Sequence, residues 1–175
     1  MKMAPLFSLP LLFFCHSSSA QTTDSLNSKL TGYWALESVK FKVPVDINKD
    51  GKKSADAIDE YTDCQKDQQI KLMEDLTARV TTGTHAKDCQ TKKEGQYTWK
   101  VVKRTVRDDK YVNGKRFIND HTVVILVLKS GTPGNDSMQF QIEEVAKKSL
   151  TLKAELRDGS DSTSEAEIVY KKSKK

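Results

Sequence analysis

Residues 138–156 read MQFQIEEVAKKSLTLKAEL, and this stretch holds two of the clearest strand patterns of the chain. Apolar residues alternate with polar ones over residues 138–142 and again over residues 149–156, after a short polar break. Such alternation fits a strand with one buried and one solvated face. Two strands separated by a few residues indicate an antiparallel hairpin.

The same period of two recurs along most of the chain. It predicts strands at residues 33–43, 67–74, 77–83, 96–107, 115–119, 121–129, 137–144, 149–156 and 164–171. Asn113-Gly114 is typical of a tight type I′ hairpin turn, and other turn residues separate the remaining strands. Eight or nine antiparallel strands joined by short connections describe an up-and-down barrel or a sandwich, so the predicted class is all-β.

Two of the predicted strands depart from simple alternation. In the first, Trp34 and Leu36 occupy one phase, whereas Val39 and Phe41 occupy the other. A β-bulge near Ser38 would reconcile the two phases. In the sixth, residues 123–128 are continuously apolar, which fits a strand covered on both faces or one that borders a partner.

The first twenty residues have the pattern of a secretory signal peptide. Lys2 provides a positive start, residues 6–14 form an apolar run too short to span a bilayer, and residues 18–20 are small. We therefore predict a secreted or periplasmic protein that begins at Gln21. The alternatives are a buried N-terminal helix and a lipoprotein that is cleaved before Cys15 and anchored there by lipid.

Composition narrows the class of protein. The 175 residues include 29 Lys+Arg and 24 Asp+Glu and are 37% hydrophobic and 30% charged, which excludes a multi-span membrane protein and a disordered chain. Removal of residues 1–20 leaves 155 residues with a net charge of +4 and no predicted transmembrane span. Two cysteines remain, Cys64 and Cys89. In an exported protein they most simply form one disulfide, with free thiols or part of a metal site as alternatives.

An ordered set of motifs in the first half of the chain carries a resemblance to a known family. The set comprises Gly32 and Trp34 in a Gly-x-Trp, Asp46, Asn48, Asp50 and Gly51 in a D-x-N-x-D-G loop, and then Cys64, Cys89, Gly95 and Trp99. It resembles the small secreted lipocalin-like domains of bacterial envelopes, which are calycin-type β-barrels. The match covers residues 30–100, and beyond them only the strand pattern supports it.

The resemblance implies a lipocalin-like antiparallel barrel of about eight strands over residues 30–172, preceded by a polar leader at 21–29 and followed by a basic tail at 173–175. In such barrels the glycine at the position of Gly32 ends an N-terminal turn, and the tryptophan at the position of Trp34 plugs the closed end. A basic residue on a late strand faces that tryptophan. Arg157 and Lys171 are the candidates in this chain.

The resemblance also implies a function, the non-catalytic binding of a small apolar or amphipathic molecule inside the barrel. With the alternation pointing inward, the predicted lining residues are Trp99, Phe140, Ile142, Leu152 and Tyr170. The alternative is that these residues fill the core. The protein would then be an envelope interaction module with a filled interior and a calcium-stabilised loop.

The D-x-N-x-D-G segment places oxygen side chains at calcium-loop spacing. Asp46, Asn48 and Asp50 match positions one, three and five, and Gly51 allows the sharp turn. Ala57 stands where an EF-hand has a bidentate glutamate. Candidates for the missing carboxylate are Asp56, Asp59 and Glu60, on a short helix capped by Ser54. The alternative is an Asx-rich surface turn without metal, and the nearby lysines at positions 49, 52 and 53 favour it.

Catalytic motifs are missing from the sequence. After residue 20 the histidines are His85 and His121, and there is no nucleophile elbow, phosphate loop or HExxH pattern, so we predict no enzyme activity. Residues 100–116 hold seven basic residues against two aspartates. Such a ribbon attracts acidic partners or anionic lipid headgroups, although a solvated outer face is the simpler interpretation. No nucleic-acid partner is predicted for an exported protein, and the sequence does not determine an oligomeric state.

Overall fold

A computed structural model describes residues 21–83, 89, 92–131, 137–157 and 163–174. Its elements are α1 (Gln21–Leu30), β1 (Gly32–Val45), β2 (Ser54–Asp56), α2 (Ala57–Glu60), α3 (Asp63–Lys66), β3 (Gln69–Leu72), β4 (Thr77–Thr82), β5 (Lys93–Val112), β6 (Lys115–Ser130), β7 (Met138–Val145), β8 (Ser149–Arg157) and β9 (Thr163–Ser173). The predicted signal peptide with Cys15, as well as His85 and Lys175, lies outside these residues. The all-β class is confirmed.

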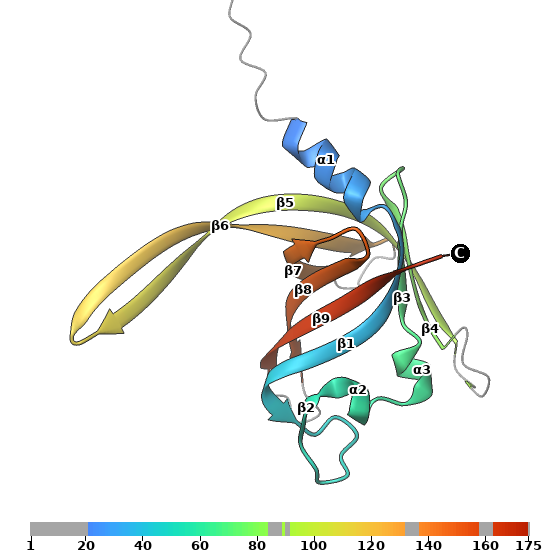
Figure 1. Cartoon of the computed structure of the whole chain (residues 1–175), viewed down its shortest axis with the longest axis horizontal. Coiled ribbons are helices and arrows are strands. Elements are labelled where there is room, and N and C mark those ends of the chain that lie inside the picture. Colours follow the sequence, from blue (N-terminus) through green and yellow to red (C-terminus); the bar gives the residue numbers. More distant parts are fainter. Residues whose placement is uncertain (1–20, 84–88, 90–91, 132–136, 158–162, 175) are drawn as a thin grey trace, which may run out of the picture.

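The strands of the described chain form one antiparallel sheet that closes on itself (Figure 1). From β3 to β9 each strand pairs with its neighbour in the sequence, and β9 returns to pair with β1 from Tyr33↔Ser173 to Phe41↔Ala166. The short β2 adds to β1 outside this ring. Together with the pairing of β1 and β3, the result is an eight-stranded up-and-down ring. The spacing of strands and turns by itself leaves a barrel and a sandwich as alternatives.

The β-bulge predicted in the first strand is confirmed. The register between β1 and β9 shifts between Leu36 and Ser38. Because of this shift, Trp34 before it and Val39 and Phe41 after it are all buried in the same core. The extra residue in the bulge therefore reverses the alternation, so that the apolar residues before and after it face the same side of the sheet.

Strands β5 and β6 are longer than predicted. The sequence pattern breaks at residue 120, but β6 runs without interruption from Lys115 to Ser130 and pairs with β5 along its whole length. Asn113 and Gly114 form the connecting turn with φ angles of 50° and 75°, the left-handed geometry of a type I′ hairpin. Across residues 123–128, side chains on both faces of β6 are buried or half-buried, as the apolar run predicts.

The polar leader is a helix. Residues 21–30 form α1, and Leu26 and Leu30 on it pack against the barrel core. The loop after β1, predicted to be irregular apart from one short helix, contains β2, α2 and α3. These three elements are too short for a pattern of period two or 3.6 to reveal them.

Trp34 is buried in the core, and its role as a plug at the closed end of the barrel stays a prediction. Its side chain is 0% exposed and its indole N–H donates to the Leu30 carbonyl at 2.6 Å. The basic residue against the ring is Lys172, with Nζ 5.0 Å from the ring. The prediction of Arg157 or Lys171 is therefore wrong, because the β1–β9 register sets Trp34 opposite Lys172, while Lys171 forms an ion pair with Glu37.

Gly32 has a physical reason to be glycine. Its φ is 140°, and a Cβ atom there would lie 2.9 Å from Cε of Lys172. The missing side chain leaves room for the lysine that covers Trp34.

Cys64 and Cys89 form the predicted disulfide, with their Cα atoms 5.5 Å apart. Cys64 lies in α3, whose first turn has a capping box between Thr62 and Gln65. The bond ties this short helical segment to the connection between β4 and β5.

Candidate metal centre

The segment that follows β1 forms a tight turn that is held by hydrogen bonds from its backbone to its own side chains. Asp46 accepts hydrogen bonds from the backbone N–H groups of Asp50 at 3.2 Å and Gly51 at 2.9 Å. Asn48 Oδ1 also accepts from the Asp50 N–H, at 2.9 Å. Lys49 and Gly51 have φ angles of 62° and 86°, which give the chain its sharp turn. The predicted Asx-rich turn is therefore present, and it brings the Asp46 and Asp50 carboxylates to one side of the loop.

Helix α2 brings a third carboxylate to the same place. The helix is capped by Asp56, which accepts from the Ile58 N–H at 3.1 Å, so the prediction that Ser54 caps it is wrong. Ser54 instead accepts from the Asp56 N–H at 3.0 Å. Ala57 is fully buried and fixes the helix against the core, and Glu60, three residues later, lies on the same side of the helix.

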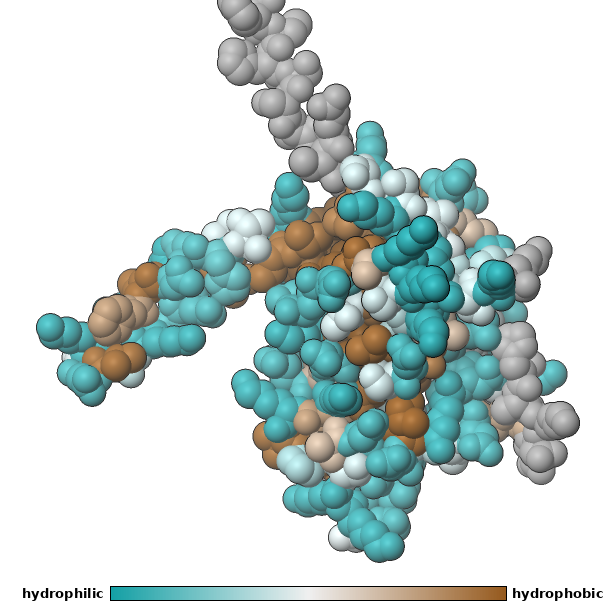
Figure 2. Space-filling model, in the orientation of Figure 1, coloured by the Kyte–Doolittle hydropathy of each residue, from teal (hydrophilic) through white to brown (hydrophobic). Residues whose placement is uncertain are grey.

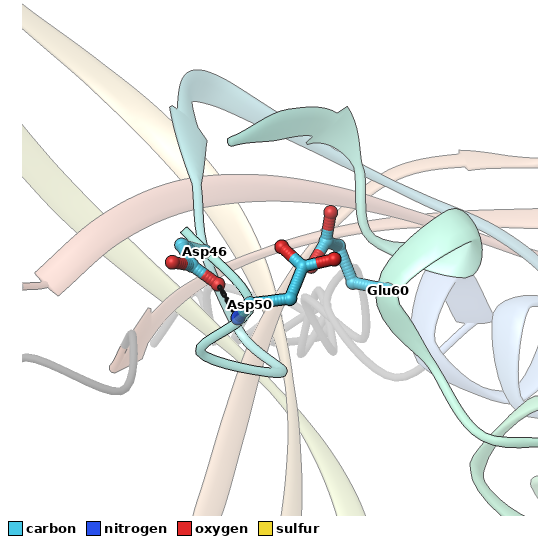
Figure 3. A group of neighbouring side chains, drawn as sticks. All are labelled: Asp46, Asp50 and Glu60. Atoms are coloured by element: carbon cyan, nitrogen blue, oxygen red, sulfur yellow. Dashed lines mark hydrogen bonds between the residues drawn. The ribbon is translucent and has the colours of Figure 1, made fainter. Parts of the chain in front are cut away.

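Asp46, Asp50 and Glu60 together form an acidic triad (Figure 3). One carboxylate oxygen from each lies within 4.8 Å of the other two. Calcium binds oxygen at about 2.4 Å, so two ligands of one ion lie no more than about 4.8 Å apart. The three oxygens are therefore close enough together to share a single calcium ion.

Glu60 is the buried member of the triad, and its carboxylate lacks a compensating partner. Its side chain is only 9% exposed, and its Oε2 is buried without a hydrogen-bond partner among the described residues. Burying a carboxylate without a partner is costly, and the neighbouring carboxylates of Asp46 and Asp50 add repulsion. In the described chain no lysine forms an ion pair with any of the three. A bound cation would supply the missing partner.

The donor set indicates which cation fits. All three groups are carboxylates, the hard oxygen ligands that calcium prefers, and no sulfur or imidazole ligand belongs to the triad. Of the three carboxylates considered from sequence, Asp56 is used as a helix cap and Asp59 is exposed, which leaves Glu60. Asn48 Oδ1 holds the turn by accepting from the Asp50 N–H, and its place as a metal ligand stays a prediction.

The predicted barrel-lining residues lie in the hydrophobic core. Trp99, Phe140, Leu152 and Tyr170 are buried in one cluster, and the half-buried Ile142 packs against it. Two of them have polar partners: the Trp99 indole N–H donates to the Met73 carbonyl at 2.9 Å, and the Tyr170 hydroxyl donates to Gln68 Oε1 at 3.0 Å. Burial raises the pKa of Tyr170, and the charge of Tyr61 raises it further.

Two cavities of the described chain lie away from most of these residues. One, of about 310 Å³, lies between β4 and β5 and is lined by Met73, Arg79 and Tyr97, among others. The other, of about 540 Å³, lies beside α1 and touches Trp99. Phe140, Ile142, Leu152 and Tyr170 line neither cavity. A ligand inside the barrel therefore stays a prediction.

The sequence predicts no enzyme activity and therefore no catalytic histidine. His121 Nδ1 lies 3.6 Å from Asp108 Oδ2 across the β5–β6 pair, and both side chains are partly exposed. The His121 Nδ1 atom is itself buried and has no hydrogen-bond partner among the described residues. The absence of enzyme activity stays a prediction.

No protein-family model, curated protein or solved structure matches the chain. Among the described residues, no helix has the length and apolar character needed to cross a membrane.

Proposed function

We propose that this chain is an exported, non-catalytic interaction module with a barrel scaffold and a calcium-binding loop at Asp46, Asp50 and Glu60. The observation that carries the proposal is the buried, unpartnered Oε2 of Glu60 beside two further carboxylates. The burial of Trp99, Phe140, Leu152 and Tyr170 in one cluster supports a filled scaffold rather than a carrier.

Calcium would act by joining two segments that approach from different directions. Asp46 and Asp50 belong to the turn after β1, whereas Glu60 belongs to α2. One ion bound to all three carboxylates neutralises the buried charge and holds the loop against the helix. Its effect is therefore to fix the shape of a surface loop, and no reaction step is assigned to it.

The environment implied by the disulfide agrees with a weak calcium site. Disulfides persist in oxidising compartments, and the Cys64–Cys89 bond is compatible with an extracellular location. Extracellular calcium modules have dissociation constants of about 10⁻⁴ to 10⁻³ M. Exposed lysines at positions 49, 52 and 53 reduce the negative field of the loop and favour an affinity in this range.

Thermal unfolding with and without calcium tests the proposal. At ten times the dissociation constant, calcium is expected to add about 1.4 kcal/mol to the free energy of unfolding, which raises the midpoint by about 3–6 °C. Magnesium at the same concentration is expected to do less, because it dehydrates reluctantly and requires stricter octahedral geometry.

Two variants make the test specific. Glu60→Gln keeps the shape of the side chain and is expected to abolish the calcium shift, while raising stability without calcium because a buried unpaired charge is removed. Asp59→Asn, on the exposed neighbour in the same helix, is the matched control and is expected to keep the full shift. A wild-type midpoint that is unchanged at about 10 mM calcium, or an equal shift in Glu60→Gln, would contradict the proposal.

A further inference from the structure

Strands β5 and β6 continue beyond the barrel as a two-stranded arm, residues 103–124 (Figure 1). Strand β4 pairs with β5 only as far as Thr98, and β7 pairs with β6 only as far as Ile125. Beyond these points neither strand of the arm has a third strand beside it in the described chain. Residues 109–120 are all exposed. At about 3.3 Å per residue, the arm extends roughly 30 Å from the barrel.

The far end of the arm carries large apolar side chains that contact no core. Tyr111 is 70% exposed, Val112 53%, Phe117 54% and Ile118 51%. A hairpin without a packed face is only marginally stable in water, and exposed apolar patches mark sites of protein or membrane interaction. Figure 2 shows brown residues between teal ones at this end of the arm.

These apolar side chains lie on both faces of the ribbon. The register pairs Tyr111 with Arg116 and Ile118 with Asp109 on one face, and Phe117 with Lys110 and Val112 with Lys115 on the other, so each apolar residue faces a charged partner. A flat protein surface covers only one face of a two-stranded ribbon. The interfacial layer of a bilayer surrounds an inserted ribbon end and covers both faces at once. The distribution therefore favours a lipid interface over a second copy of this chain.

The charges of the arm fit the same environment. Residues 103–124 include six Lys or Arg residues and three aspartates. Two of the aspartates are used in ion pairs within the arm, Asp109 with Arg116 and Asp120 with Arg107. Lys110 and Lys115, which flank the apolar residues, form no ion pair within the described chain and are exposed. Basic side chains next to apolar and aromatic ones are typical of segments that bind anionic membrane surfaces.

We propose that the end of the arm, residues 109–118, inserts into the headgroup region of a membrane that contains anionic lipids. Tyr111, Val112, Phe117 and Ile118 enter the interface, and Lys110 and Lys115 contact the headgroups. The length of the arm holds the barrel away from the bilayer. In particular it separates the acidic triad from an anionic surface that would repel it, since the loop lies on another side of the barrel (Figure 1).

Co-flotation of the full chain with lipid vesicles tests this proposal, with EDTA present so that calcium contributes nothing. Vesicles of phosphatidylcholine with about 30% phosphatidylglycerol are expected to bind the protein, and vesicles of phosphatidylcholine alone to bind at least tenfold less. Raising the salt from about 0.1 M to about 0.5 M is expected to weaken binding to the anionic vesicles.

Two arm variants separate the apolar and the electrostatic contributions. Tyr111→Ser with Phe117→Ser is expected to reduce the affinity for anionic vesicles at least tenfold, because most of the inserted apolar area is lost. Lys110→Gln with Lys115→Gln is expected to reduce it by about 25-fold, since each basic residue near the surface contributes about fivefold. The matched control is Val43→Ser, which replaces a 62% exposed apolar residue on the barrel and is expected to bind as the wild type does.

The alternative is that a second copy of this chain covers the apolar end of the arm. Sedimentation of the same proteins without lipid measures whether they self-associate. Self-association that is lost in the Tyr111→Ser, Phe117→Ser variant, without vesicle binding by the wild type, would overturn the proposal in favour of a dimer. Equal vesicle binding by the wild type and both arm variants would also overturn it. Because residues 109–118 at the end of the arm are all exposed, unchanged midpoints of thermal unfolding in both variants are expected and exclude misfolding as a cause of lost binding.

Discussion

Strands β5 and β6 pass through two environments without a break in their pairing. In the barrel, the register pair Trp99↔Leu128 is buried in the core. In the arm, the same two strands pair Tyr111 with Arg116, and both side chains are exposed. The backbone hydrogen-bonding partners continue from one region to the other. The difference is that the flanking strands β4 and β7 accompany β5 and β6 only within the barrel.

The comparison teaches that strand pairing and burial are separate contributions to this fold. In the barrel, apolar area removed from water stabilises the strands at about 25 cal/mol per Å². In the arm, the visible contacts are cross-strand pairs such as Arg107–Asp120, whose charged atoms are 2.9 Å apart. Exposed ion pairs of this kind stabilise by about 1 kcal/mol or less. We therefore expect the arm to open locally while the barrel stays folded.

The largest expected difference in the free energy of unfolding is between alanine substitutions of one aromatic residue in the barrel and one in the arm. Trp34→Ala is expected to lower the free energy of unfolding by about 3–5 kcal/mol, because it opens a cavity in the core and leaves the Leu30 carbonyl without its donor. Tyr111→Ala in the arm is expected to change it by less than about 0.5 kcal/mol. Urea unfolding of both variants measures the difference, and comparable losses would show that the arm packs in solution.

Removing the disulfide is expected to lower the stability of the barrel and to leave that of the arm unchanged. Cys64→Ser with Cys89→Ser frees the chain between two residues separated by 25 positions. The chain-entropy model values this closure at about 3.5 kcal/mol, so the unfolding midpoint in urea is expected to fall accordingly. Hydrogen exchange of the arm amides is expected to stay the same. Faster exchange in the arm would show that the two regions unfold together.

Alkaline pH is expected to destabilise the barrel through Tyr170. Burial raises the pKa of Tyr170, with the charge of Tyr61 as a second cause, so the folded protein keeps this phenol neutral while the unfolded chain ionises near pH 10. The stabilisation is fully present below about pH 10 and is lost as the pH rises above it. Between about pH 9 and pH 11 the expected loss is about 1.4 kcal/mol. Urea unfolding of Tyr170→Phe, which cannot ionise, is expected to show a shallower decline, and identical slopes would contradict the assignment.

The smallest expected effect is a loss of local stability of the arm at low pH. The hydrogen bond from Arg116 lowers the pKa of Asp109, so the pair stabilises the arm above the ordinary aspartate pKa of about 3.9 and loses this contribution as the pH falls through the lowered value. As the pH falls, the protection factors of the arm amides, which correct for the slower intrinsic exchange in acid, are expected to decrease in the wild type and to change less in Asp109→Asn. Barrel amides serve as the internal reference. An acid-induced loss of protection that is the same in both proteins would rule out this pair as the cause.

Much of the fold follows from local sequence pattern. Alternation located the long strands, Asn113-Gly114 located the hairpin turn, and the conflict of phase between Trp34 and Val39 located the bulge. The calcium-loop spacing located Asp46 and Asp50. Each of these signals depends on residues close together in the chain, where backbone geometry fixes their relation.

The sequence by itself therefore determined which segments pair as strands, where they turn, and which loop gathers carboxylates. Only the tertiary structure decided which of three acidic residues completes the triad, because burial of Ala57 in the core sets the orientation of α2 and brings Glu60 inward. It also decided that Lys172 covers Trp34 and that residues 103–124 leave the barrel. The physical reason is the same in each case. Alternation specifies the face on which a side chain lies, but only packing between distant segments specifies whether that face is covered.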